Sequence, residues 1–191
     1  MMNTLESIEK RRSIRKFKPT PVSEQALKEL VRLGRLYSSA MNGQPIRFAI
    51  ITKKEDRDFL FTHLNWAMRL HPYPIAETER PMAYVLLLGK QEENNFFEFD
   101  AGSCAATVML AAESMGIGNC CLKITKKEEI RDHFAFGEYA PCYAIALGEP
   151  GVGSKAVEAK GDLSYYLDEN GNFCVPKRSV DDVLVYDDTK K

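Results

Sequence analysis

An uninterrupted apolar run at residues 83–88 constrains the fold of this chain more than any other feature. The run has the length of a strand and predicts one that is buried on both faces. A second apolar stretch, residues 100–115, is rich in alanine and predicts a central helix, with Asp100 as its N-cap. Because 45% of the 191 residues are hydrophobic, we expect one core and a single domain over residues 1–191.

Helices and strands alternate along the rest of the chain. Asn3 and Ser23 occupy N-cap positions and predict helices that begin beside them. Further helices are expected at residues 55–70 and 126–134, and strands at residues 47–52, 119–123 and 143–147. The Pro-containing segment 71–75 is a candidate lid. Residues 149–171, rich in Gly, Ser, Lys and Asp, are expected to form an exposed connection.

Bulk composition argues against several classes of protein. A formal net charge of -1 gives no global reason to bind nucleic acid. No apolar run approaches the roughly 18 to 20 residues that span a bilayer, and the N-terminus has no signal-peptide pattern, so a cytoplasmic protein without membrane contact is expected. The five cysteines form no C-x-x-C pair, and we expect buried thiols.

Several catalytic motifs are absent from the sequence. There is no phosphate-binding G-x-x-x-x-G-K-[ST], and Cys121 stands where a dinucleotide fingerprint that began at Gly116 would need a third glycine. The three histidines lack the spacing of a helical zinc site, so no metal site is expected. Ser103 lacks the second glycine of a nucleophile elbow. What remains is a pair of basic clusters near opposite ends, a pattern suited to holding a phosphorylated cofactor.

The first cluster, which we call the basic segment, is Arg-Arg-Ser-Ile-Arg-Lys-Phe at residues 11–17. If this segment is extended, alternation sends Arg11, Ser13 and Arg15 to one side. Guanidinium groups bind a phosphate monoester bidentately, so these three side chains could converge on one. Taken alone, however, the cluster is better explained as a solvated basic turn after a helix.

A second candidate element, which we call the polar loop, covers residues 37–45 and carries hydroxyl and amide side chains. Such groups both donate and accept hydrogen bonds, as the pyrimidine edge and ribityl hydroxyls of a flavin require. An ordinary turn explains this loop equally well when it is viewed in isolation.

Together the motifs are specific. Arg-Arg-Ser-Ile-Arg, then Ser-x-x-Asn-x-Gln-Pro, Asp-Ala-Gly before an alanine-rich helix that ends in Gly-Ile-Gly, Ala-Leu-Gly-Glu-Pro and a terminal Lys-Arg resemble the nitroreductase family in order and spacing. The resemblance covers nearly the whole chain. It implies an α+β fold, a three-layer α/β/α sandwich around a mostly antiparallel sheet, and an intertwined homodimer.

The resemblance also assigns residues to a bound FMN. It places the phosphate and the ribityl chain on the basic segment, completes the phosphate pocket with the terminal basic pair, and lines the flavin with the polar loop of the other subunit. The residues concerned are Arg11, Arg12, Ser13 and Arg15, then Lys177 and Arg178, and finally Ser38, Ser39, Asn42 and Gln44. No side chain is expected to be catalytic, because flavin N5 carries the chemistry; backbone N–H groups of residues 123–125 are expected near the ring.

The implied activity is an FMN-dependent NAD(P)H oxidoreductase that reduces nitroaromatic, quinone or similar small electrophilic acceptors by a ping-pong hydride mechanism, with NADH or NADPH as donor. The alternatives are a flavin-binding redox sensor or FMN carrier without turnover, a reductive dehalogenase or flavin-degrading enzyme on the same fold, and a binding protein without flavin. Departures from the family pattern at residues 37–38, 46 and 121–123 bear on substrate preference. Trp66, Tyr73, Phe96 and Phe97 could line an acceptor pocket, although core packing is the better expectation for each.

Overall fold

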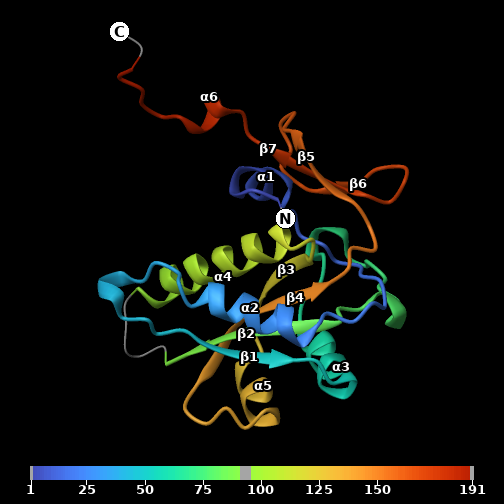
Figure 1. The fold of residues 1–191 in the computed structure, drawn as a ribbon. Helices are drawn as coiled ribbons and strands as arrows, with labels where there is room; N and C mark the ends of the chain where they lie inside the picture. Colours follow the sequence, from blue (N-terminus) through green and yellow to red (C-terminus); the bar gives the residue numbers. More distant parts are fainter. Residues whose placement is uncertain (1, 91–95, 190–191) are drawn as a thin grey trace.

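A four-stranded sheet forms the centre of the computed structural model, which describes residues 2–90 and 96–189 (Figure 1). Its strand order is β1-β2-β4-β3, and every neighbouring pair is antiparallel. The strands are β1 (Arg47–Ile51), β2 (Ala83–Gly89), β3 (Gly118–Lys123) and β4 (Ala140–Gly148). The mostly antiparallel sheet expected from the sequence is confirmed.

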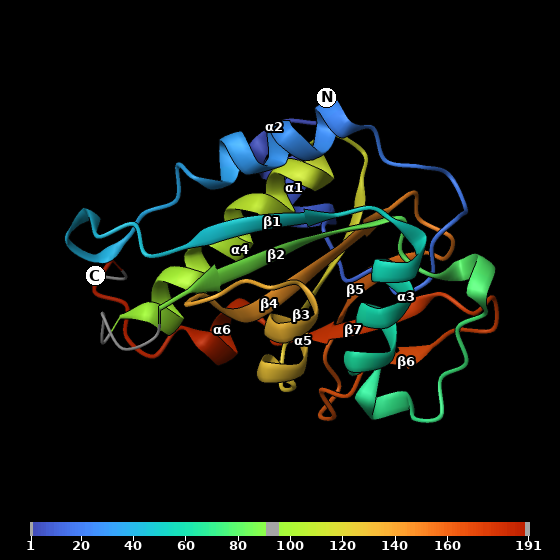
Figure 2. The same ribbon diagram turned by 90° about the horizontal axis from the view of Figure 1, so that it is seen from below.

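Helices cover both faces of this sheet. Because side chains alternate along a strand, Val85 and Leu87 of β2 join one core cluster while Tyr84 and Leu86 join the other. The first cluster lies under α2 (Glu24–Gly34) and α4 (Phe97–Ser114), and the second under α3 (Lys54–His63) and α5 (Lys127–His133). Figure 1 shows the first pair above the sheet and the second pair below it, and Figure 2 shows the same layers from below. The fold is therefore the expected three-layer α+β sandwich.

The capping predictions are also confirmed. Helix α1 (Thr4–Lys10) starts with a capping box in which Asn3 Oδ1 accepts from Glu6 N at 3.0 Å and Glu6 Oε2 accepts from Asn3 N at 3.1 Å. At the start of α2, Ser23 Oγ accepts from Ala26 N at 3.2 Å. These caps satisfy N–H groups that have no partner inside the helix.

Two helix boundaries differ from the sequence prediction. Helix α3 ends at His63 rather than near residue 70, because Leu64 is extended and Ala67 has a left-handed φ of 44°. Only a short 3-10 turn, Met68–Leu70, follows it. Helix α4 begins at Phe97, so Asp100 lies inside its first turn and is not its N-cap.

A second, smaller sheet corrects the prediction of a plain connection at residues 149–171. It consists of β5 (Ser154–Glu158), β7 (Phe173–Lys177) and β6 (Tyr166–Leu167), in the order β5-β7-β6. After it come α6 (Val180–Val183) and a C-terminal arm that runs away from the rest of the fold (Figure 1). Within the described ranges, no helix combines the length and apolarity needed to cross a membrane.

Candidate functional site

The basic segment runs extended along the edge of the main sheet. It leaves α1 at Arg11, and Ser13 then forms an isolated parallel bridge with Asn119 of β3. Phe17 is buried at the other end, where it packs on Gly148; a Cβ on that glycine would lie 2.8 Å from Phe17 Cδ1. The segment is thus held at both ends against β3 and β4.

Charged and polar groups of the basic segment act on the buried thiol of Cys120 in β3. Burial raises the pKa of this thiol, while the charge of Arg15, a hydrogen bond with Ser13 and the charge of Arg11 act in the opposite direction. The backbone of Ser13 also bridges to Asn119, the residue before Cys120. The convergence of Arg11, Ser13 and Arg15 on one phosphate stays a prediction.

The guanidinium groups of this segment form no ion pair within the described residues, although the charge of Glu113 acts on Arg11 and Arg12. Among residues 2–90 and 96–189, no carboxylate forms an ion pair with Arg11, Arg12 or Arg15, whereas Lys16 pairs with Glu79 at 2.9 Å. All three arginines are half-buried. Unpaired charges at such a position are costly unless an anion joins them. A phosphate ester fits this requirement.

Arg12 adds a second sign of an incomplete site. Its Nη1 donates to Arg11 O at 2.5 Å, but its Nε is buried without a hydrogen-bond partner. Burial and the neighbouring Arg11 charge lower the pKa of Arg12, and Glu113 opposes them from a distance too long for an ion pair. A buried donor of this kind calls for an acceptor from outside the described chain.

The terminal basic pair lies in a different environment. Lys177 ends β7, where its carbonyl oxygen accepts from Ala159 N at 2.8 Å, and both Lys177 and Arg178 are exposed. In the described part of the chain, no hydrogen bond joins either side chain to the basic segment. The predicted meeting of the two basic clusters therefore stays a prediction.

The polar loop has a strained backbone. Met41, Asn42 and Gln44 all have positive φ, at 52°, 55° and 47°. Non-glycine residues adopt this region at a cost, which the surrounding structure must offset. Met41, Asn42, Gln44 and Ser38 are exposed, and Figures 1 and 2 place the loop at one edge of the molecule.

Three hydrogen bonds hold this strained loop. Ser39 Oγ accepts from Gln44 N at 3.1 Å, and Gln44 Nε2 donates to Asn42 Oδ1 at 3.1 Å. Asp100, which is fully buried on α4, accepts from Ala40 N at 2.9 Å. Ser39, Asn42 and Gln44 thus form one hydrogen-bonded unit, while Ser38 projects beside it. No hydrogen bond among the described residues connects this loop to the basic segment.

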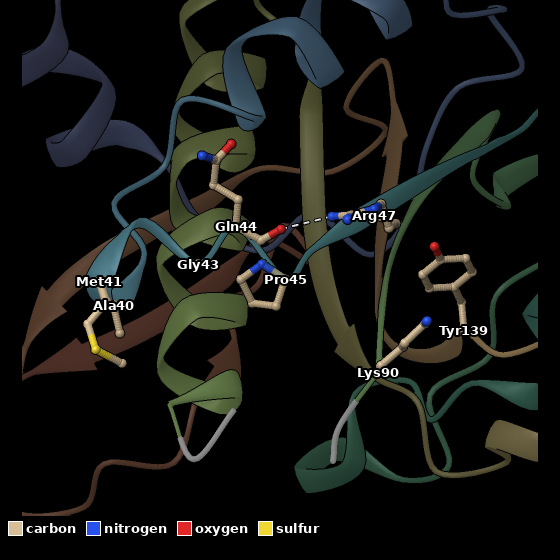
Figure 3. Close-up of a pocket in the computed structure, with 8 residues that line it drawn as sticks. All are labelled: Ala40, Met41, Gly43, Gln44, Pro45, Arg47, Lys90 and Tyr139. Carbon is tan, nitrogen blue, oxygen red and sulfur yellow. Dashed lines mark hydrogen bonds between the residues drawn. The ribbon is translucent and has the colours of Figure 1, made fainter. Parts of the chain in front are cut away.

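A cavity of about 260 Å³ opens beside the polar loop (Figure 3). Arg47 lines this cavity, and its Nη1 donates to Gln44 O at 2.8 Å. Lys90 lies on the opposite side, where its Nζ is 5.6 Å from the ring centre of Tyr139. Its lining residues are Ala40, Met41, Gly43, Gln44, Pro45, Arg47, Lys90 and Tyr139. None of them belongs to the basic segment, so this cavity and the basic segment are separate within one chain.

The predicted acceptor pocket is only partly formed. Trp66 and Tyr73 do line one cavity of about 300 Å³ together with His71. Phe97 is 4% exposed and belongs to the core under α4, and Phe96 is 51% exposed. Core packing is therefore correct for Phe97, and the four aromatic residues do not share a pocket.

One backbone expectation is wrong in part. Ile124 N donates to Cys142 O at 2.9 Å, so this N–H group is already engaged and cannot serve a flavin ring.

No group of three His, Cys, Asp or Glu side chains that could hold a metal occurs among the described residues.

Sequence reasoning missed two kinds of site residue. Asp100 anchors the polar loop, and the signal for this role is a carboxylate inside an otherwise apolar helix, which needs a buried donor. Tyr165 and Phe173 stack on Arg15, with ring centres 4.6 and 4.7 Å from its guanidinium carbon. No local pattern in residues 149–173 signals that contact.

The chain matches one protein-family model and is similar to a curated protein of the same family. The model of the "Nitroreductase family" matches residues 8–149. A curated relative, "Putative NADH dehydrogenase/NAD(P)H nitroreductase" of Methanothermobacter thermautotrophicus, is 27% identical over 156 residues, which are 78% of this chain and 78% of the relative.

Solved structures show the same fold. A "putative nitroreductase in complex with fmn" from Desulfovibrio desulfuricans superposes with a TM-score of 0.72 at 21% identity, over 98% of each chain. An "FMN-dependent Nitroreductase" from Clostridium difficile R20291 superposes with a TM-score of 0.66 at 20% identity, over 83% of this chain and 94% of that one.

Proposed function

Because this chain belongs to the nitroreductase family, we propose that it is an FMN-dependent oxidoreductase that passes electrons from NADH or NADPH to a small electrophilic acceptor such as a nitroaromatic or a quinone. The names of its relatives support both the flavin and the nicotinamide donor. The observation that carries the proposal is the basic segment, where three half-buried guanidinium groups form no ion pair within the described residues and Arg12 Nε lacks a hydrogen-bond partner.

The residues of the basic segment would bind the phosphate end of FMN. Arg11 and Arg15 offer charged donors, and Ser13 offers a hydroxyl between them. Lys177 and Arg178 would complete this pocket, as the resemblance of the sequence implies. An N–H of Arg12 would find its missing acceptor in the same ligand.

The polar loop would line the flavin from the partner subunit. Within one chain the loop and the basic segment are separate, so a second chain would bring Ser38, Ser39, Asn42 and Gln44 over the ring. The exposure of Ser38, Asn42 and Gln44 at one edge of the molecule supports that role. We therefore propose a homodimer in which both chains form each site.

Bound FMN would supply the group that accepts a hydride from the donor and passes electrons to the acceptor. The chain itself would bind the cofactor, orient it and restrict water, and no side-chain nucleophile is needed. Donor and acceptor would use the same open face in turn, which predicts ping-pong kinetics. We also propose that residues 1–191 act as one domain, because the small sheet contacts the basic segment through Tyr165 and Phe173.

The visible absorbance spectrum of the purified protein tests this function. We expect a yellow protein with flavin bands that bleach when NADH or NADPH is added without oxygen and return when a nitroaromatic or a quinone follows. A colourless protein that takes up no added FMN would refute the proposal. Bound flavin that neither donor reduces would favour a carrier or sensor, and product analysis would identify a dehalogenase or a flavin-degrading enzyme.

A further inference from the structure

The guanidinium group of Arg15 contacts two neighbouring aromatic rings. Its carbon is 4.6 Å from the ring centre of Tyr165 and 4.7 Å from that of Phe173, and the two ring centres are 5.9 Å apart. These distances are within the range at which a cation interacts with the face of an aromatic ring. Because the two ring centres are so close together, the rings lie side by side against the guanidinium group and not on opposite faces of it.

Both rings are fixed by contacts of their own. Phe173 is fully buried at the start of β7, where its N–H donates to Gly153 O at 2.9 Å, and its ring lies 5.3 Å from that of Tyr73. The hydroxyl of Tyr165 accepts from Arg69 N at 3.2 Å. Rings held in this way restrict the rotamers of the arginine that packs against them.

The edge of the guanidinium group stays free for a ligand. Among the described residues, Arg15 makes one hydrogen bond, from Nη1 to Ser13 O at 3.3 Å, and no ion pair. Arginine carries five N–H donors, all in the plane of the group. Lys16 contrasts with it, because its ammonium group pairs with Glu79 at 2.9 Å. Arg15 is thus held without being neutralised.

We propose that Tyr165 and Phe173 are positioning residues that hold the guanidinium edge of Arg15 toward the phosphate of FMN. The inference rests on the proposed function. Both rings lie beyond residues 8–149, the part of the chain that the family model matches. A preset arginine loses less conformational freedom when it binds an anion, so the stack would increase the preference for FMN over riboflavin.

Dissociation constants of flavin-free protein for FMN and for riboflavin test this role. Tyr165→Leu removes one ring of the stack, and we expect it to raise the Kd for FMN by roughly 3- to 30-fold, the range of a cation–ring contact. The Kd for riboflavin, which has no phosphate, should stay within about twofold on the same reasoning. Tyr165→Phe keeps the ring and should keep the preference for FMN.

Two more variants separate positioning from folding. Tyr166→Leu removes the adjacent tyrosine, which is 49% exposed, and should leave both constants unchanged. Arg15→Lys keeps the charge but loses the planar stack, and should lower the preference for FMN as Tyr165→Leu does.

The outcomes are distinguishable. Equal weakening of FMN and riboflavin by Tyr165→Leu, or no change in either, would overturn the positioning role while the proposed function stands. A wild-type protein that binds no FMN would overturn both.

Discussion

At the scale of single residues, Arg11 and Arg15 decide whether the basic segment is a phosphate site. Their joint replacement by alanine should raise the Kd for FMN by at least about 100-fold, because each hydrogen bond to a charged group contributes roughly 1.5–3 kcal/mol. Equilibrium titration with FMN measures the change. Lys18→Ala removes a nearby cation that already pairs with Glu149 at 2.6 Å, and should have little effect. Unchanged flavin retention in the double variant would remove the phosphate-site assignment.

The cysteines should be inert in the folded protein. Burial raises the pKa of Cys104, Cys121 and Cys142 to about 12, and Cys120 and Cys174 are also buried. Since the thiolate is the reactive form, Ellman's reagent at pH 8 should modify none of the five thiols within minutes, and all five after unfolding in guanidinium chloride. A thiol that reacts rapidly in the native protein would contradict this expectation.

Features that depend on neighbouring residues could be predicted from the sequence, whereas contacts between distant residues could not. The alternation of residues 11–15 predicts that Arg11, Ser13 and Arg15 share one side, and this stays a prediction. The stack on Arg15 was not predictable, because Phe173 reaches it from a part of the chain about 160 positions away. Only the folded chain brings these groups together.

At the scale of helices and strands, it was easier to predict which elements form than where each of them begins and ends. Apolar period and capping residues identified α1, α2, β2 and α4. Helix α3 was predicted too long, because Ala67 carries no sequence signal of the left-handed conformation that it adopts. The strands β5 and β6 were not predicted, because they are short and lie in a segment whose Gly, Ser and Asp content is typical of a loop.

The anchor of the polar loop gives a prediction at this scale. Asp100→Ala removes the acceptor of Ala40 N and leaves three positive-φ residues less constrained, so we expect a loss of about 1–3 kcal/mol in the free energy of unfolding. Urea unfolding measures it. Asp100→Asn keeps an oxygen acceptor and should lose less. FMN and riboflavin affinities should fall together, in contrast to Tyr165→Leu. Equal stability of the alanine variant and the wild type would show that Asp100 is not an anchor.

The turn between β6 and β7 should be sensitive to acid. Hydrogen bonds from the Asn172 backbone and from Lys155 lower the pKa of Asp168 below the ordinary value of an aspartate. A lowered folded-state pKa means that the stabilisation is present above about pH 4 and is lost as the pH falls below it. Asp168→Asn should therefore lower the Tm at pH 7 and have little effect at pH 3. Glu169→Gln makes the same charge change next to it and should have little effect at either pH. A Tm difference for Asp168→Asn that stays constant with pH would contradict the assignment.

At the scale of the whole molecule, the residue pattern was sufficient to predict the sandwich, whereas the predicted homodimer rests on the family resemblance. A strand buried on both faces requires a layer on each side, and both layers are present. Large apolar side chains nevertheless remain exposed on α1, α4, α6 and the C-terminal arm, namely Leu5, Ile8, Phe99, Val180, Val183, Leu184, Val185 and Tyr186. Apolar surface of this kind is typical of a protein interface.

The proposed dimer can be tested on α4. Phe99 is 68% exposed, and Phe99→Glu would place a charge in the contact between subunits. We expect light scattering to give twice the 21.6 kDa chain mass for the wild type and one chain mass for the variant. Met68→Glu makes the same change at a residue that is 67% exposed in the 3-10 turn Met68–Leu70, outside α1, α4, α6 and the C-terminal arm, and should stay dimeric. Because the polar loop would then be missing from each site, the monomeric variant should also lose FMN. A dimeric Phe99→Glu protein that keeps its flavin would show that this face of α4 is not the interface.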